Sequence, residues 1–248
     1  MAGHSKWSNI KHRKGAQDAK RGKLFTKLGK ELTIAAKEAG GDPNFNPRLR
    51  LAIDKAKAAN MPKDNLERAI KKGTGELEGV DYMEIRYEGY GPEGTAFIVE
   101  VVTDNKNRSA SEVRTAFSRK NGNLGTDGAV SWMFQRKGEI VVAAEGVDAD
   151  ELMMAALEAG AEDVKDEDGE FTVLTDPADC NTVSEELKKA GYNITEAEVA
   201  MIPDNKVQIT DLDTAKKVMA LYEALDDLDD VNDVYSNFDI SEELLEQL

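Results

Sequence analysis

The first third of the chain places apolar residues at the spacing of amphipathic helices. Over residues 23–39 they recur every three or four positions, and the pair Gly40-Gly41 ends the pattern. The same spacing predicts two shorter helices over residues 47–59 and 63–72, with Pro47 suited to the first turn of the former. Three short amphipathic helices joined by short connections predict a small helical bundle.

From residue 80 the apolar pattern changes to that of strands. Residues 82–88 alternate, and residues 95–103 are rich in branched side chains. A helix is predicted over residues 110–120. Another strand is predicted over residues 129–135, with Val130, Trp132 and Phe134 on one face. This part of the chain therefore has the predicted order β-β-α-β.

The next segment has the predicted order β-α-β-β-α-β. Its strands cover residues 139–143, 161–165, 170–175 and 195–201, and its helices cover 149–159 and 178–190. This is the element order of ferredoxin-like domains. A helix over 214–225 and a strand over 231–237 remain, and they are too few to form a domain. We expect them to complete the earlier β-β-α-β unit.

These elements predict an α+β fold in which a three-helix bundle with a basic arm precedes two α/β sandwich domains. The ferredoxin-like domain is inserted into the other. The expected boundaries are residues 1–22 for the basic arm, 23–77 for the bundle, 78–136 plus 204–248 for the discontinuous domain, and 137–203 for the insertion.

Charge is divided unequally along the 248 residues. Residues 1–75 contain 18 Lys and Arg against 7 Asp and Glu, a net charge of +11, whereas residues 76–248 have a net charge of −27. Because salt screens charges over about 8 Å, the local sign governs binding more than the total of −16. The first third should therefore attract polyanions such as DNA or RNA.

The basic arm is the strongest candidate for this contact. It has too few apolar residues to offset the entropy of ordering, so we expect it to be mobile until it meets a partner. Its cations would bind phosphates, while Trp7 offers a flat surface to an exposed base or, alternatively, folds back onto the bundle. We also expect the lysines of residues 23–39 to form a stripe that faces solvent. The predicted nucleic-acid-binding residues are Lys6, Trp7, Lys11, His12, Arg13, Lys14, Lys20, Arg21, Lys23, Lys27, Lys30, Lys71 and Lys72.

Other motifs argue against catalysis. Residues 89–94 match a dinucleotide fingerprint in spelling, but no helix follows, so a hairpin loop is expected. Residues 166–169 and 226–230 are interpreted as an acidic turn and a charged helix end. Residues 119–125 are expected to stop a helix, with weak support for a phosphate contact. Cys180 is the only cysteine and is expected to be semi-buried at a helix start. We expect no catalytic residue, metal or cofactor.

No apolar run approaches the roughly 20 residues that cross a bilayer, and the opening residues lack the apolar core of a signal peptide. The expected location is the cytoplasm, without a membrane partner.

Several motifs resemble the YebC family: MAGHSKWSNIKHRK at residues 1–14, ANMPKDNLERAIKKG at 59–73, YEGYGPEG at 87–94, DNKNR at 104–108 and GNLGTDGAV at 122–130. The resemblance implies a three-domain cytoplasmic protein of the kind usually described as a probable DNA-binding transcriptional regulator. The family also includes the mitochondrial translational activator of cytochrome c oxidase and bacterial members associated with ribosomes that translate proline-rich stretches.

The leading hypothesis is a non-enzymatic nucleic-acid-binding regulator of gene expression. One alternative is a ribosome-associated translation factor that binds ribosomal RNA and eases translation of proline-rich stretches. A second is an adaptor that binds the ribosome or another protein through its acidic domains.

Overall fold

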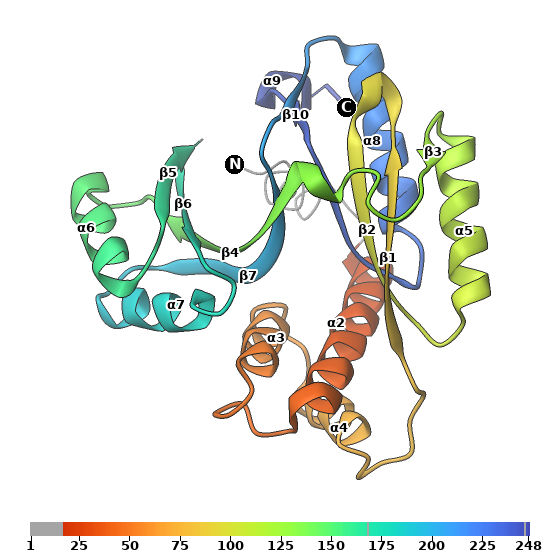
Figure 1. Cartoon of the computed structure of the whole chain (residues 1–248). Helices are drawn as coiled ribbons and strands as arrows, with labels where there is room; N and C mark the ends of the chain where they lie inside the picture. Colours follow the sequence, from red (N-terminus) through yellow and green to blue (C-terminus); the bar gives the residue numbers. More distant parts are fainter. Residues whose placement is uncertain (1–16, 168, 246) are drawn as a thin grey trace. The chain divides into compact units, whose positions relative to one another are not determined.

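The computed structural model describes residues 17–167, 169–245 and 247–248 (Figure 1). Within these residues the chain forms two compact units. One contains residues 35–77 and 136–201, and the other contains 17–34, 78–135 and 202–248. Each unit is thus assembled from segments far apart in the sequence. The domain boundaries that the sequence suggested stay predictions.

Three helices open the described chain, as the sequence predicted: α2 (Gln17–Ala39), α3 (Pro47–Ala58) and α4 (Lys63–Gly73). Helix α2 begins six residues earlier than expected, so the last residues of the predicted arm are helical. Asn46 explains where α3 starts, because its side chain accepts a hydrogen bond from the Leu49 amide at 3.0 Å. The Asn46 amide also donates to the carbonyl oxygens of Ala35 and Gly40. One buried side chain therefore joins the end of α2 to the start of α3.

The larger sheet has the strand order β3-β1-β2-β9. Its strands are β1 (Met83–Tyr90), β2 (Ala96–Thr103), β3 (Asn123–Leu124) and β9 (Val231–Ser236), all antiparallel to their neighbours. The short helix η1 (Pro92–Gly94) joins β1 to β2. Strand β9 comes from the C-terminal segment and pairs with β2, so that segment completes the sheet as expected.

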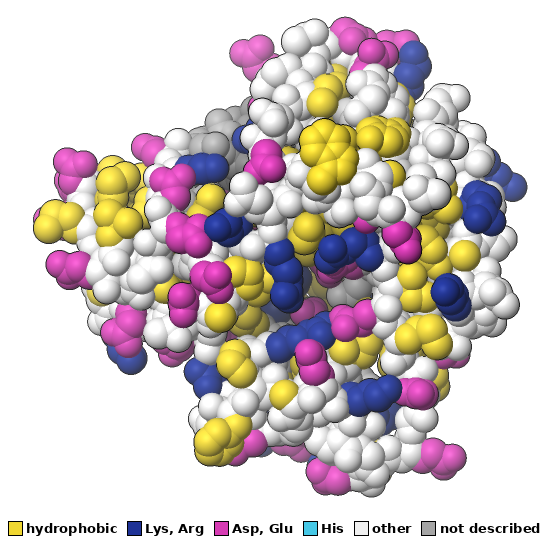
Figure 2. Space-filling view, in the orientation of Figure 1, with side chains coloured by type: hydrophobic (Ala, Val, Ile, Leu, Met, Phe, Trp, Pro, Cys, Tyr) yellow, Lys and Arg dark blue, Asp and Glu magenta, His cyan; other side chains and the backbone are white. Residues whose placement is uncertain are grey.

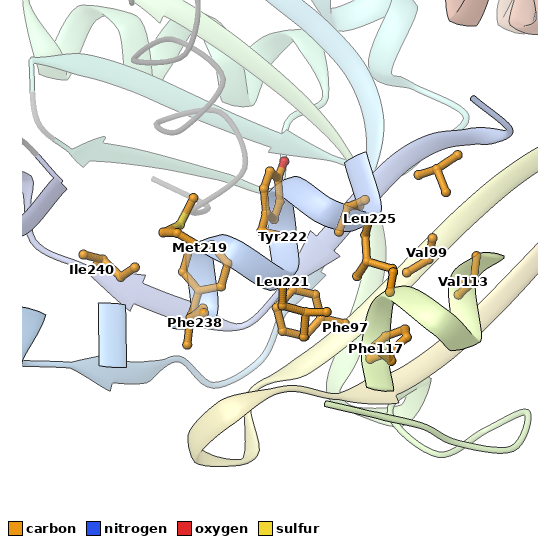
Figure 3. Packing of buried hydrophobic residues seen from close by; sticks show 14 of the residues in the cluster. Phe97, Val99, Val113, Phe117, Met219, Leu221, Tyr222, Leu225, Phe238 and Ile240 are labelled. Atoms are coloured by element: carbon orange, nitrogen blue, oxygen red, sulfur yellow. The ribbon is translucent and has the colours of Figure 1, made fainter. Parts of the chain in front are cut away.

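Helices α5 (Lys106–Arg119) and α8 (Leu212–Asp226) contact each other and cover one face of this sheet. Their apolar side chains meet those of β2 in a common core (Figure 3). The Phe97 and Phe117 rings pack edge to face with centroids 6.2 Å apart, and Tyr222 meets Phe238 in the same way at 6.0 Å. The C-terminal segment adds elements that the sequence did not predict: β8 (Val207–Ile209), its parallel partner β10 (Phe238–Ile240), and α9 (Glu242–Leu245).

The second sheet has the order β5-β6-β4-β7 and belongs to the ferredoxin-like segment. It contains β4 (Phe134–Ala143), β5 (Asp163–Glu167), β6 (Glu170–Thr175) and β7 (Ile194–Pro203), with helices α6 (Ala149–Ala159) and α7 (Cys180–Lys189). Both helices contribute to one core with β4 and β6. The predicted β-α-β-β-α-β order is confirmed, and so is the α+β fold class.

Candidate nucleic-acid interface

Lys23 and Lys27 of α2 turn toward the end of α8. The expected solvent-facing stripe is wrong for Lys27 and Lys30, whereas Lys23 and Lys37 are exposed. Lys27 Nζ lies 2.7 Å from a carboxylate oxygen of Asp226 and 2.8 Å from its carbonyl oxygen. Lys23 Nζ donates to the carbonyl oxygen of Asp227 at 2.9 Å. Carbonyl groups at a helix C-terminus lack intrahelical partners and carry partial negative charge. The acidic run 226–230 is therefore a helix end, as predicted, and these lysines neutralise it.

Lys30 makes the most buried of these contacts. Its ammonium donates to the carbonyl oxygens of Val102 and Asp229, at 3.1 and 2.8 Å, and to Asp230 Oδ1 at 3.0 Å. An ammonium group has three donors, and all three are used here. With only 8% of its surface exposed, Lys30 has no donor left for a phosphate.

Asp230 joins α2 to the start of α5. Its Oδ2 accepts hydrogen bonds from Thr103, Ser109 and both Nε and Nη2 of Arg108, at 2.6 to 3.0 Å. Burial raises the pKa of Asp230, but the hydrogen bonds from Arg108, Lys30, Thr103 and Ser109 outweigh it and lower the pKa to about 2. Arg108 belongs to the motif at residues 104–108, which therefore has a structural role in this unit.

Most of the predicted basic arm lies outside the described residues. This applies to Lys6, Trp7, Lys11, His12, Arg13 and Lys14, and to the expected mobility of residues 1–16. Lys20 and Arg21 lie in the first turns of α2. The Arg21 guanidinium is exposed and sits 5.4 Å from the centroid of the Phe25 ring.

Helix α4 presents an exposed cationic face made of Arg68, Lys71 and Lys72. Because residues three and four apart are neighbours on a helix, these three side chains lie together, whereas Leu66 and Ala69 are buried. No ion pair to any of the three is found within the described part of the chain. Lys71 and Lys72 were predicted from the sequence, while Arg68 was missed although its spacing indicates the same face.

A hollow of about 610 Å³ adjoins this helix. It is lined by Lys71 but also by the carboxylates of Asp42, Glu67 and Glu76. That balance of charge opposes an anion inside the hollow. Phosphate groups would instead meet the cationic face from solvent.

The loop before β4 is organised by the buried carboxylate of Glu88. It accepts hydrogen bonds from the backbone N–H groups of Gly128, Val130 and Ser131, at 2.8 to 3.0 Å. Burial raises the pKa of Glu88, but these bonds have the larger combined effect and lower it. Because three of its amides bind one carboxylate, the chain forms the short helix η2 (Ser131–Met133). The strand predicted over residues 129–135 is therefore wrong up to Met133, and only its last two residues belong to β4.

Trp132 is 71% exposed at the centre of η2 rather than packed in a strand. Its indole N–H donates to the carbonyl oxygen of Ala129 at 3.1 Å. The hydroxyl of Tyr90 donates to the same oxygen at 2.9 Å. Trp132 is therefore an exposed aromatic ring on a hydrogen-bonded turn, a feature that the sequence pattern did not reveal.

The remaining loop predictions are confirmed. Residues 89–94 connect the antiparallel strands β1 and β2, which is the expected hairpin. Helix α5 ends at Arg119, and the Gly122 amide then donates to the carbonyl oxygen of Phe117 at 2.8 Å. The acidic turn lies between β5 and β6, although Asp168 itself is outside the described residues.

Cys180 is fully buried at the start of α7, and burial raises the pKa of its thiol to about 12. A thiol so difficult to ionise is a poor nucleophile. Within the residues that the structure covers, no cluster of three or more His, Cys, Asp or Glu is arranged to hold a metal ion. Nor does any helix in that part have the length and apolar character needed to cross a membrane.

Carboxylates also gather beside Cys180 in the ferredoxin-like segment. Burial and the neighbouring Glu198 and Glu196 raise the pKa of Glu139 to about 8. Glu198 in turn forms an ion pair with Lys55 of α3, with 2.6 Å between Nζ and Oε2. This cluster joins α3 to β7 through the Lys55–Glu198 pair.

The fold is that of an α+β protein with N-terminal helices. On the face drawn in Figure 2, Lys and Arg side chains are interspersed with Asp and Glu side chains, and the total charge of the chain is −16. The sequence model for the TACO1/YebC N-terminal domain matches residues 5–76, and the model for the TACO1/YebC second and third domains matches residues 82–238. The chain belongs to the TACO1/YebC family.

Individual relatives agree with this assignment. A probable transcriptional regulatory protein of Fusobacterium nucleatum is 75% identical over 248 residues, and one of Geobacter sulfurreducens is 59% identical over 248 residues; both alignments cover the whole of each chain. The crystal structure of a conserved hypothetical protein from Aquifex aeolicus superposes with a TM-score of 0.83 at 50% identity. That superposition covers 92% of this chain and 94% of the Aquifex chain.

Proposed function

We propose that this protein is a non-enzymatic nucleic-acid-binding regulator of gene expression. The observation that carries the proposal is the exposed face of Arg68, Lys71 and Lys72 on α4, in a chain whose total charge is −16. Residues 47–73 contain eight Lys and Arg against three Asp and Glu. The names of the Fusobacterium and Geobacter relatives support the regulatory part of the proposal.

Cations on one helix face bind phosphates by releasing condensed counterions, and such binding weakens as salt rises. The α4 face carries one exposed amide, Asn65, beside its three cations, so it offers mainly phosphate contacts and little for the reading of base edges. We expect the basic arm to supply further phosphate contacts through Lys6, Lys11, Arg13 and Lys14. The α2 lysines Lys27 and Lys30 are excluded from the proposed surface because they are already bound to the end of α8.

Phosphate contacts of this kind serve duplex DNA and ribosomal RNA alike, so a translation factor on the ribosome is the main competing function. The test is to sediment the full chain with ribosomes and to titrate it with random duplex DNA, both over a series of salt concentrations. Saturable DNA binding without ribosome association supports transcriptional regulation. Ribosome binding that outlasts DNA binding as salt rises supports the translational function, and failure to bind either contradicts the proposal.

Exposed apolar side chains on helix α6 support an adaptor function as a second candidate. Met153, Met154 and Leu157 are exposed there by 43, 64 and 51%. Residues 144–170 around them contain eleven Asp and Glu against one Lys. An apolar patch within acidic surroundings suits a basic protein segment that carries apolar side chains. Titration with a Lys/Leu peptide and an equally charged Lys/Ser peptide tests this, since equal affinity for both would contradict a role for the patch.

A further inference from the structure

The exposure of Trp132 is unusual for its residue type. Tryptophan is highly buried on average, yet 71% of this residue is exposed. The residues on either side are anchored in the core, since Val130 is fully buried and Phe134 is 6% exposed. Between these anchors the indole ring is held outward, where solvent reaches it.

The turn beneath Trp132 is fixed by five hydrogen bonds, of which the one from the Val130 amide to Glu88 is buried. Glu88 binds three backbone amides of the loop, and the carbonyl oxygen of Ala129 accepts from both Tyr90 and Trp132. A ring held in this way loses little conformational freedom when a ligand stacks on it. The arrangement is that of a preorganised aromatic platform.

The charge near this turn differs from that of the surrounding sequence. Residues 106–135 contain five Lys and Arg against two Asp and Glu, within a segment 76–248 of net charge −27. Arg114, Arg119 and Lys120 are exposed and make no ion pair with any residue that the structure describes. Lys120 lies three residues before Asn123, and Asn123 pairs with Tyr90, whose hydroxyl helps to hold the turn. Arg119 and Lys120 therefore lie toward the same end of the sheet as the Trp132 platform.

From this combination we infer that Trp132 stacks on an unpaired base of a single-stranded nucleic acid, with Arg119 and Lys120 binding the adjoining phosphates. A flat indole accepts any base, and cations beside it track the backbone. The bases of a duplex are stacked on one another, so a duplex cannot present a free base to this ring. The inference rests on the proposed nucleic-acid-binding function and narrows its ligand to unpaired strands or loops.

Fluorescence provides a direct test because the chain has only two tryptophans. In a Trp7→Phe background, Trp132 is the sole indole, and titration with a uridine or adenosine oligonucleotide should quench its emission saturably. In the full chain, Trp132→Ala should weaken single-strand binding about five-fold or more, the factor expected for losing one stacked base. Trp132→Phe should restore most of the affinity, and duplex binding should stay unchanged.

Phe45→Ala provides the matched control, since it also removes an exposed aromatic side chain and should leave affinity unaltered. If duplex and single strands bind but Trp132→Ala matches the parent and no quenching occurs, the inference fails while the proposed function stands. If no nucleic acid binds at all, both fail. Quenching by a proline-rich peptide but not by oligonucleotides would show that Trp132 binds a protein ligand and not a base, and it would overturn the inference.

Discussion

Lys30 and Asp230 are separated by 200 residues in the sequence, yet Lys30 Nζ lies 3.0 Å from Asp230 Oδ1 in a buried ion pair. The side chains are 10 and 7% exposed. Through this pair the first described helix is joined to the segment between α8 and β9, and Arg108 binds the other carboxylate oxygen. Removing one partner of a buried pair leaves an uncompensated charge.

Asp230→Asn should therefore destabilise the fold by about 3–5 kcal/mol, because Lys30 and Arg108 would face each other without a carboxylate between them. Urea unfolding at pH 7 measures the change. Asp239→Asn is the control, since Asp239 is a partly exposed carboxylate of β10 that lies outside this network. Equal stability of the two variants would contradict the role assigned to Asp230.

The carboxylate of Asp230 should also make the stability of the protein depend on acid pH. Its folded-state pKa of about 2 lies below the ordinary value of 3.8. The stability from this group is thus fully present above pH 4 and is lost as the pH falls toward 2. The free energy of unfolding should drop by about 2 kcal/mol across that window from this group. In Asp230→Asn that part of the acid dependence should disappear, and an unchanged slope would argue against the lowered pKa.

Glu139 should make the stability of the protein depend on pH in the opposite direction. Its pKa is raised from 4.5 to about 8, so the folded state holds a proton more tightly than the unfolded state between those values. Stability should then decrease as the pH rises from 4.5 to 8. Glu139→Gln should stabilise the protein by about 1–3 kcal/mol at pH 8.5 and by much less at pH 5. Thermal unfolding at both pH values measures this, and a variant equally destabilised at both would contradict it.

Glu88 should control the turn that carries Trp132. Glu88→Gln retains the size of the side chain but offers only one accepting oxygen to the three backbone amides. We expect a loss of about 1–3 kcal/mol and increased mobility of the turn. In a Trp7→Phe background the change is visible as lower fluorescence anisotropy of Trp132. Unchanged anisotropy would show that the carboxylate does not hold the turn.

The elements that the sequence predicted well are those set by local periodicity. The spacing of Leu66, Ala69 and their neighbours gives α4 both its extent and its buried face, and the same reasoning locates the cationic face opposite. Helix α5 begins four residues before the predicted start because the Asn105 side chain caps it there, accepting a hydrogen bond from the Arg108 amide. Such caps are also local and can be found by inspection.

Two other errors arose from long-range contacts. Alternation around Trp132 resembled a strand, but Glu88, more than 40 residues earlier, captures the amides that a strand would need. The lysines of α2 lie opposite its apolar positions, which locally predicts exposure. Only the fold brings residues 226–230 to Lys27 and Lys30. Periodicity shows which face is apolar, but not which distant charges cover the polar face.

Two charge-neutralised variants of the full chain test whether the α4 face binds nucleic acid. Arg68→Gln/Lys71→Gln/Lys72→Gln removes the α4 face, whereas Lys189→Gln/Lys216→Gln/Lys217→Gln removes three exposed cations from the acidic part of the chain. Affinity for random nucleic acid is measured over a range of salt concentrations. We expect weaker binding by the α4 variant, with a salt slope smaller by about two to three, and near-parental binding by the control. Equal affinity and equal slope in both variants, with folding intact, would contradict the claim that the α4 face binds nucleic acid.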